Sequence, residues 1–467
     1  MSLKSHFFML GIFCSLIFTT YPSNYPFLKP DHLFRSYMIS YYSMNDNSKS
    51  RYYYDYELDP QKLVNYDRMI LERIRQHSHL HRAIAPSPQP HKIINIDHFV
   101  RSGHRRKDHT KAFMKAWKVA CAKGGVLLVP QDKTYRVRPI KFSGPCHSQL
   151  IFKIKGTIEA STRISDYRDR RLWLVFANLH NFKVEGGGII DGMGQVWWKN
   201  SCKINKTKSC QHAPTAVTFV GCKNFMLDGL KITNAQQMHL TFQRCNAVRA
   251  SNIFIKAPAN SPNTDGIHIT ETRNIRLTRS LIRTGDDCIS IVSGSKNVHI
   301  SEITCGPGHG ISIGSLGKGN SKAIVSNVLV NNTRLCGTQN GVRIKTWQGG
   351  QGYVKNVVFQ NITMRNVSNP IIIDQHYCDQ KTPCSEKEWA VQVSNVVYES
   401  IKGTSFTEAA IKFDCSKSHQ CHRILLHNID LVLEKGHKSA SALARADCKN
   451  VELYNRGKVA PRCFHET

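Results

Sequence analysis

Two aspartates and a histidine recur at one position of a short repeated pattern. Asp265 and Asp287 each lie two residues before an Ile-x-Ile triplet, and His309 lies two residues before a third. The triplets begin at residues 267, 289 and 311, so they are spaced by 289 − 267 = 22 and 311 − 289 = 22 residues. Hydrolysis of a glycosidic bond needs one carboxyl group as proton donor and another as base or nucleophile. The pattern therefore predicts acid–base chemistry on a sugar, provided that the fold brings these positions together.

Further charged residues would join this corner. Asp286 precedes Asp287, and crowding of like charges should raise the pKa of at least one carboxyl group. Arg343 and Lys345 alternate with apolar residues, so they should project on the same flank as the carboxylates. A single Asp in a turn would more simply cap the backbone, but the combination favours a catalytic site with a cationic grip for an anionic sugar.

The elements that must position these residues are short strands. Apolar-x-apolar triplets recur over about residues 172–433, and an Asn followed by apolar-x-apolar recurs at Asn181, Asn224, Asn274, Asn297, Asn356 and Asn395. A period of about 20–30 residues with strands broken by Gly, Asn and Ser is typical of a β-solenoid. Stacked coils would bring the aligned side chains to about 5 Å from one another. The middle residue of each triplet should point to solvent, whereas a β-sandwich would need hairpin turns that are not found.

The N-terminal part differs in composition. Residues 7–18 form an apolar run after Lys4, which predicts a signal peptide over residues 1–21. Residues 22–90 are rich in Tyr, His and Arg and end in a Pro-rich stretch, so we expect a leader or pro-segment with one short helix over residues 60–76. Residues 91–467 would form the catalytic domain.

Two further elements are predicted at the start of that domain. Residues 93–99 have the pattern of a strand. Asp108-His-Thr110 then precedes apolar residues at helical spacing, which predicts a capped helix that closes one end of the solenoid.

The charge balance indicates an anionic partner. Lys and Arg number 64 and Asp and Glu 33, giving 64 − 33 = +31. Charge alone does not distinguish three classes of partner: nucleic acid, anionic lipid and acidic polysaccharide. The signal peptide and the lack of a basic-aromatic module favour the polysaccharide. We expect no metal, no cofactor, no nucleic acid and no membrane contact in the mature chain, which should be a secreted monomer of the extracellular space.

The cysteines and sequons agree with secretion. The chain has 16 cysteines, of which Cys14 would leave with the signal peptide. Two closely spaced pairs look like staples on short loops, namely Cys378 with Cys384 and Cys415 with Cys421. Cys336 looks like the unpaired thiol. Candidate glycosylation sites are Asn205, Asn331, Asn361 and Asn366.

Four motifs resemble, in order and spacing, the signatures of polygalacturonases, glycoside hydrolase family 28. They are Asn263-Thr-Asp265-Gly, Gly285-Asp-Asp287, Gly308-His-Gly310 and Arg343-Ile-Lys345. The plant enzymes have near-identical stretches to SPNTDGIHI (261–269), TGDDCISI (284–291) and NGVRIKTWQGG (340–350). The resemblance covers about residue 93 to the C-terminus. It implies an all-β fold, a single-stranded right-handed parallel β-helix with an N-terminal capping helix.

The resemblance also implies an activity and roles for residues. The expected reaction is inverting, endo-acting hydrolysis of α-1,4-galacturonosyl linkages in de-esterified pectin of the plant cell wall or apoplast. Asp286 would be the general acid, Asp265 and Asp287 would activate the attacking water, and His309 would support the protonation state of the acid. The residues expected to bind the substrate are Asn263, Arg343, Lys345, Gln375 and Tyr377. Cys288 and Cys305 would form a disulfide beneath the site.

Two features depart from the resemblance or conflict with it. Stacking at one coil spacing suggests carboxyl groups closer than the roughly 6.5–9.5 Å that is usual for inverting enzymes. The sequence FVRSGHRRKDHT (99–110) lacks the Gly-Asp turn with which the family opens its domain.

Several alternatives remain open. They are an exo-acting enzyme, a rhamnogalacturonan hydrolase and a catalytically silent pectin-binding homologue.

Overall fold

The computed structural model describes residues 92–100, 108–147, 149–204, 207, 209–380, 384–434 and 443–463. The signal peptide, the leader and the helix expected over residues 60–76 lie outside the described residues, as does the sequon at Asn205. Within the described ranges, no helix combines the length and the apolar composition needed to cross a membrane.

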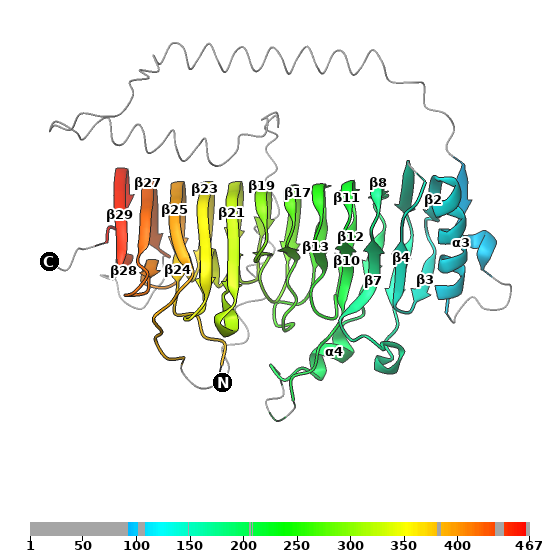
Figure 1. Cartoon of the computed structure of the whole chain (residues 1–467), viewed down its shortest axis with the longest axis horizontal. Helices are drawn as coiled ribbons and strands as arrows, with labels where there is room; N and C mark the ends of the chain where they lie inside the picture. The colour runs from blue at the N-terminus through cyan, green and yellow to red at the C-terminus, as the bar shows by residue number, and fades with distance from the viewer. Residues whose placement is uncertain are drawn as a thin grey trace, which may run out of the picture. The chain divides into compact units, whose positions relative to one another are not determined.

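Parallel strands stack along the chain and form two sheets (Figure 1). The first sheet has 11 strands, each aligned with the same part of the next coil. Its strands are β4 (Ile140–Ser143), β7 (Leu172–Ala177), β10 (Thr215–Val220), β13 (Leu240–Gln243), β16 (Ile267–Thr270), β18 (Ile289–Ile291), β20 (Ile311–Leu316), β22 (Asn340–Thr346), β24 (Asn369–Asp374), β26 (Ala409–Asp414) and β28 (Arg445–Lys449).

The second sheet has 18 strands and forms the remaining walls of the coils. Its strands are β1 (Ile93–Asn95), β2 (Gly125–Val129), β3 (Thr134–Val137), β5 (Leu150–Ile154), β6 (Thr157–Ala160), β8 (His180–Glu185), β9 (Ile189–Asp191), β11 (Lys223–Asp228), β12 (Lys231–Thr233), β14 (Asn246–Ser251), β15 (Phe254–Lys256), β17 (Arg273–Arg283), β19 (Lys296–Cys305), β21 (Lys322–Cys336), β23 (Gln351–Val367), β25 (Gln392–Ser405), β27 (Cys421–Leu433) and β29 (Val451–Ala460). The fold is the predicted right-handed parallel β-helix, and its coils extend beyond residues 172–433 on both sides.

Helix α3 (Thr110–Lys123) lies at the N-terminal end of the stack, as predicted (Figure 1). The Asp108 carboxylate accepts a hydrogen bond from the Thr110 amide at 3.0 Å, which satisfies one amide of the first turn. Phe113, Ala116 and Ala120 are fully buried on its inner face, covering apolar side chains that the first coil would otherwise expose.

The prediction of one strand over residues 93–99 is only half correct. Strand β1 ends at Asn95, and a 3-10 helix, η2 (Ile96–Phe99), follows. The Asn95 side chain accepts a hydrogen bond from the Asp97 amide at 3.0 Å, and this local cap favours the turn over an extended chain. The other short helices are α4 (Gln195–Lys199), η3 (Ile164–Asp166) and η4 (Lys318–Asn320).

The interior of the coils is filled by aligned apolar side chains. Ile267, Ile289 and Ile311 stand in register on three successive strands and are each fully buried. Nearer the N-terminus, Phe219 stacks between Phe176 and Phe242, with ring centroids 4.9 and 5.6 Å away. Like residues at like positions therefore form continuous columns that fix the register of every coil.

The recurring asparagines have a structural role at one corner. Asn274 donates to Asn246 at 2.9 Å, Asn297 donates to Asn274 at 2.8 Å, and Asn327 donates to Asn297 at 3.0 Å. Asn274, Asn297 and Asn327 each have a positive φ, which the short Asn side chain tolerates better than most. This ladder turns the chain at the same place in each coil and so keeps successive coils aligned.

Candidate active site

The fold brings the predicted carboxylates and histidine to one corner. Ile267 pairs with Ile289 and Ile289 pairs with Ile311, so Asp265, Asp287 and His309 occupy equivalent positions before three neighbouring strands. The backbone continues this alignment, because the Gly266 amide donates to the Asp287 carbonyl at 2.9 Å. The sequence spacing of 22 residues thus corresponds to one full coil.

The close approach of two coils explains why a glycine, Gly310, follows His309. The φ of Gly310 is +85°, and a Cβ atom built on it would lie 2.0 Å from the backbone oxygen of Asn340. Only glycine fits this close approach of two coils without displacing the backbone. Its neighbour His309 is held by a backbone hydrogen bond from its amide to the Asp286 carbonyl at 2.8 Å.

Asp287 lies at the centre of a buried charge cluster. Its Oδ1 accepts from Arg343 Nη2 at 2.9 Å and from Ser312 Oγ at 2.9 Å, and its Oδ2 accepts from Lys345 Nζ at 2.9 Å. The Arg343 Nε also donates to Ser312 Oγ at 3.1 Å. The exposed side-chain fractions are 3% for Asp287, 12% for Arg343 and 9% for Lys345. Both cations are therefore paired with Asp287 before any substrate binds. The sequence spacing did not indicate this pairing.

Asp286 is the more accessible carboxylate. Its Oδ1 lies 3.1 Å from His309 Nδ1 and accepts from the Asp287 amide at 2.8 Å, while its Oδ2 accepts from Asn263 Nδ2 at 3.3 Å. Burial would raise the pKa of Asp286, but hydrogen bonding to His309 and the charge of His309 outweigh it, so the pKa is lowered. Asn263 thus orients this carboxylate.

Asp265 has the opposite electrostatic environment. It is buried, and its Oδ2 accepts from Ser290 Oγ at 2.9 Å. Burial raises the pKa of Asp265 well above its ordinary value, and the neighbouring charges of Asp286 and Asp287 add to this effect. The predicted crowding effect therefore acts on Asp265 rather than on Asp286.

Three residues of the site were missed by the sequence reasoning: His268, Ser290 and Ser312. Each is the middle residue of an Ile-x-Ile triplet, and the prediction that these residues point to solvent is wrong for the serines. Ser290 is 2% exposed and Ser312 is 0% exposed, because the aspartates of the preceding coils fold over them. The signal was present in the sequence, since each serine follows an aspartate of the preceding coil by 25 residues.

Tyr377 and Gln375 have different environments. Lys345 Nζ lies 5.2 Å from the centre of the Tyr377 ring, and burial raises the pKa of Tyr377 to about 12. Gln375 is fully buried, donates to the Val391 carbonyl at 2.8 Å and accepts from the Ser416 amide at 2.9 Å. The expectation that Gln375 lines a cleft is therefore wrong, because its amide group joins backbone segments in the interior.

The cysteines form the three named pairs and further ones. The structure joins Cys288 to Cys305, Cys378 to Cys384 and Cys415 to Cys421. It also contains disulfides between Cys121 and Cys146, Cys202 and Cys210, and Cys448 and Cys463.

The prediction that Cys336 is the unpaired thiol is wrong, since Cys336 is disulfide-bonded. In the described part of the chain the free cysteines are Cys222 and Cys245. Both are buried on successive coils, where each thiol donates to a backbone carbonyl.

The remaining sequons lie on the outer wall. Asn361 is exposed, and its amide nitrogen donates to Asn331 Oδ1 at 3.3 Å on the preceding coil. Asn331 and Asn366 are half-buried. Asn361 is therefore the most accessible of the three.

A metal ion is a further possibility at the same corner. Donor atoms of Asp286, Asp287 and His309 lie within 4.8 Å of one another. A divalent cation placed there would, however, meet Arg343 and Lys345, which already occupy both oxygens of Asp287. The donor set is better suited to proton transfer, and we continue to expect no metal.

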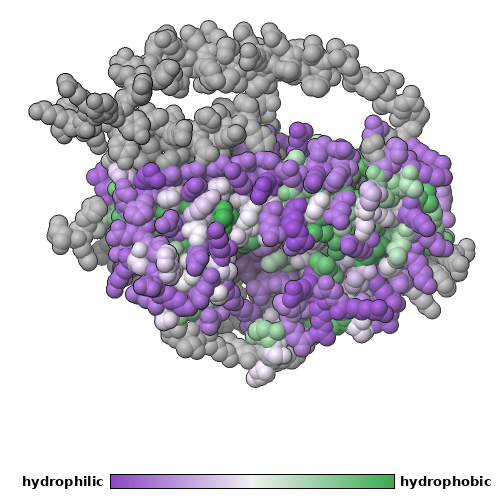
Figure 2. Space-filling view, viewed as in Figure 1, coloured by the Kyte–Doolittle hydropathy of each residue, from purple (hydrophilic) through white to green (hydrophobic). Residues whose placement is uncertain are grey.

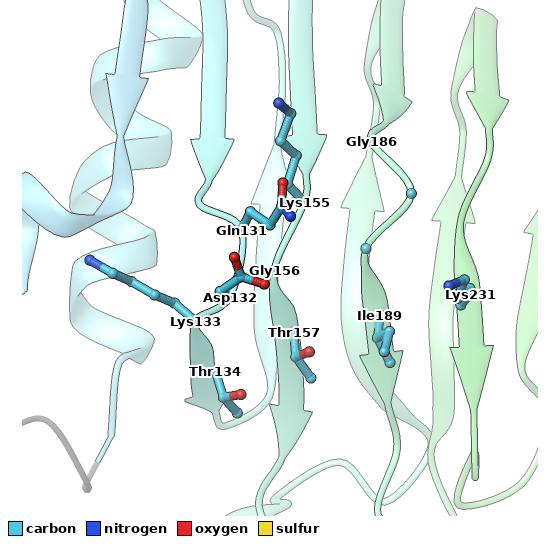
Figure 3. A pocket seen from close by; sticks show the side chains of 12 residues that line it. Gln131, Asp132, Lys133, Thr134, Lys155, Gly156, Thr157, Gly186, Ile189 and Lys231 are labelled. Atoms are coloured by element: carbon cyan, nitrogen blue, oxygen red, sulfur yellow. The ribbon is translucent and has the colours of Figure 1, made fainter.

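A separate cavity of about 670 Å³ lies on the earlier coils (Figure 3). Its charged lining residues are Asp132, Lys133, Lys155 and Lys231, and Gly156 and Gly186 also line it. None of the predicted site residues lines it. A single carboxylate cannot supply both an acid and a base, so this cavity does not have the composition of a hydrolytic site.

Comparisons with known proteins agree with the geometry. Residues 121–458 match the family described as glycosyl hydrolases family 28. The chain is 52% identical over 405 residues to "Polygalacturonase QRT2" of Arabidopsis thaliana, covering 84% of this chain and 91% of that protein. It is 54% identical over 374 residues to "Polygalacturonase-2" of Solanum lycopersicum, covering 80% and 81%.

Solved structures share the fold at low sequence identity. The endo-xylogalacturonan hydrolase from Aspergillus tubingensis gives a TM-score of 0.67 at 23% identity, covering 78% of this chain and all of that one (100%). The polygalacturonase from Erwinia carotovora gives 0.62 at 22% identity, covering 79% and 98%.

Proposed function

Because the chain belongs to glycosyl hydrolases family 28, and is therefore a glycoside hydrolase, we propose that it is a polygalacturonase. Its substrate is de-esterified homogalacturonan, whose α-1,4-galacturonosyl linkages it cleaves with inversion and in endo mode. The names of the relatives from Arabidopsis and tomato support this substrate. We further propose that residues 1–21 direct secretion, that residues 22–90 form a leader, and that residues 91–467 act as a monomer in the cell wall.

One observation carries the proposal: three aspartates meet beside two cations, and the pKa is raised in Asp265 but lowered in Asp286. In the proposed reaction Asp286 gives a proton to the leaving oxygen as the glycosidic C1–O bond breaks. A water molecule forms the new C1–O bond and loses its proton to the Asp265 and Asp287 pair. Asp286 is the acid because it is the most accessible of the three and is held by Asn263 and His309.

The pKa directions describe how one proton is distributed. In the free enzyme the raised pKa of Asp265 and the lowered pKa of Asp286 favour the proton on Asp265. The productive arrangement, with Asp286 protonated and Asp265 ionised, is then a minor form of a coupled pair. In that minor form Asp286 is a strong acid and Asp265 is a strong base, so an enzyme molecule in this form reacts readily.

Two cations pair with one carboxylate in the buried cluster of Asp287, Arg343 and Lys345. Within this cluster, two positive charges face one negative charge, a balance of 2 − 1 = +1. A galacturonate carboxylate entering next to Tyr377 would meet this excess. The surface seen in Figure 2 is mostly hydrophilic, and the overall charge of +31 also favours a polyanion.

The test is incubation of the purified chain with de-esterified homogalacturonan. Release of reducing ends separates an enzyme from a catalytically silent pectin-binding homologue, which would bind the polymer without cutting it. Early oligomers indicate endo action, and monomer alone indicates exo action. Absence of cleavage by well-folded protein rejects the proposal, and cleavage of rhamnogalacturonan in its place would reassign the substrate.

A further inference from the structure

A buried hydrogen-bond chain connects Asp265 to the edge of the site. Ser290 Oγ lies 2.9 Å from Asp265 Oδ2 and 2.8 Å from His268 Nδ1. Ser290 and Asp265 are buried, whereas His268 is half-buried. The three residues come from β16, β18 and the turn before β16, so the stacking of two coils creates the chain. Its outer end is therefore the imidazole.

The imidazole is neutral, which lets it both accept and donate. Burial lowers the pKa of His268 to about 4, an effect that Asp287 opposes and Lys345 reinforces. A neutral histidine carries its proton on either Nδ1 or Nε2, depending on the partner of each nitrogen. The charged groups that face Asp265 are Asp286, Asp287 and Lys345.

We propose that Ser290 and His268 form a proton relay for Asp265. When Asp265 is protonated, its O–H donates to Ser290 Oγ, the serine O–H donates to His268 Nδ1, and the ring proton is on Nε2. When Asp265 ionises, the serine O–H donates to the carboxylate and the Nδ1–H donates to Ser290 Oγ. One proton leaves Asp265, each bond in the chain reverses, and one proton is released from Nε2, so the step balances without any co-reactant.

The relay rests on the proposed function and adds a step to it. After the attacking water has given its proton to Asp265, the buried carboxyl group must lose that proton before the next turnover. Asp287 cannot serve as the exit, because its oxygens are held by Arg343, Lys345 and Ser312. Ser290 and His268 supply a route that keeps the carboxylate hydrogen-bonded in both states.

The first experiment does not depend on activity. A folded-state pKa above the unfolded value means that Asp265 contributes stability that is present at low pH and lost as pH rises through the folded pKa. In Ser290→Ala the ionised carboxylate also lacks its donor. The deficit in melting temperature relative to wild type should therefore grow by about 2 °C as the pH rises through the folded pKa of Asp265.

Ser280→Ala is the matched control. Ser280 is equally buried, donates to the Thr278 carbonyl at 3.0 Å and accepts from the Ile253 amide at 3.2 Å, with no ionisable partner. Its deficit should not change with pH. Equal pH dependence in Ser290→Ala and Ser280→Ala overturns the relay, whether or not the wild type cleaves pectin. A wild type without activity rejects only the proposed function.

Kinetics provide the second experiment. Loss of the Ser290 hydrogen bond raises the pKa of Asp265 further, so kcat/KM should fall about tenfold and the basic limb of its pH profile should move up by about one unit. Ser290→Thr keeps the hydroxyl, so kcat/KM and the position of the basic limb should both be close to those of the wild type. His268→Ala should lower kcat, and the double variant Ser290→Ala/His268→Ala should lose no more than Ser290→Ala. Additive losses, or an unchanged profile in Ser290→Ala, would show that the two residues do not act as a relay.

Discussion

The Lys345 ammonium lies 2.9 Å from Asp287 Oδ2, inside the protein rather than in an open groove. Lys345→Met keeps the length of the side chain and removes the charge, leaving Asp287 with less compensation for its burial. We expect a loss of unfolding free energy of about 3–5 kcal/mol, the cost of breaking a buried ion pair on one side. Chemical denaturation measures it.

Lys412→Met is the control for this prediction. Lys412 is 43% exposed and lies 3.7 Å from Asp414 on the same sheet. Its substitution should change stability by no more than about 0.5 kcal/mol. Equal effects of the two substitutions would contradict a structural role for Lys345.

Arg343→Ala should affect more than substrate affinity. Sequence reasoning predicts mainly a weaker grip on the charged sugar, but Arg343 also holds Asp287 and Ser312 in place. We therefore expect KM to rise and kcat to fall together, measured by initial rates over a range of polygalacturonate concentrations. The remaining affinity should weaken further with salt, because screening reduces the attraction of exposed charges. A rise in KM with kcat unchanged would limit Arg343 to binding.

Asp286→Asn should remove cleavage and preserve the fold. Asn at this position can still accept from the Asp287 amide but cannot deliver a proton, so kcat should fall by at least about 10²–10⁴-fold. Reducing-end release measures the rate, and circular dichroism checks the fold. Asp430→Asn, on an exposed pair with Lys458, should be neutral. Near-normal turnover in Asp286→Asn would exclude the acid assignment.

The pH profile of kcat/KM should be bell-shaped. Activity needs Asp286 protonated and Asp265 ionised. Because the pKa of Asp286 is lowered and that of Asp265 is raised, the acid limb follows Asp286 and the basic limb follows Asp265. Below the acid limb both carboxyl groups are protonated, and above the basic limb both are ionised. The singly protonated pair that contains the reactive form therefore becomes scarcer in both directions, and the rate falls on both sides.

His309→Ala tests the acid limb of that profile. It removes the hydrogen bond and charge that lower the pKa of Asp286, so the acid limb should move to higher pH. An acid limb that stays at the same pH would show that His309 does not set the pKa of the proton donor.

The anomeric configuration of the product tests whether the short distance between the carboxyl groups allows inversion. Oxygens of Asp286 and Asp287 lie within 4.8 Å, closer than the roughly 6.5–9.5 Å that is usual for inverting hydrolases. We nevertheless expect inversion, because cations and Ser312 occupy both oxygens of Asp287 and hinder it as a nucleophile. Proton NMR during the first minutes should show the β-anomer. An initial α-anomer would establish retention.

The sequence alone determined the solenoid and the alignment of Asp265, Asp287 and His309 at one corner of it. Apolar triplets spaced by one coil fix which residues face inward. Parallel stacking then aligns Asp265, Asp287 and His309, since the triplets that follow them pair residue for residue on neighbouring coils. The capping helix could be predicted for a similar local reason, because its apolar spacing and the Asp108 side chain that accepts from the Thr110 amide lie in adjacent residues.

Only the tertiary structure decided how the charges are shared. Arg343 and Lys345 are 56 and 58 residues from Asp287 along the chain, and spacing could not say that they neutralise this carboxylate instead of remaining free. The burial of Ser290 and the interior position of Gln375 were equally hidden, because exposure depends on what the neighbouring coils place above a side chain. The pKa directions follow from that burial, so the distribution of the proton between Asp265 and Asp286 is a property of the packed coils rather than of the motif.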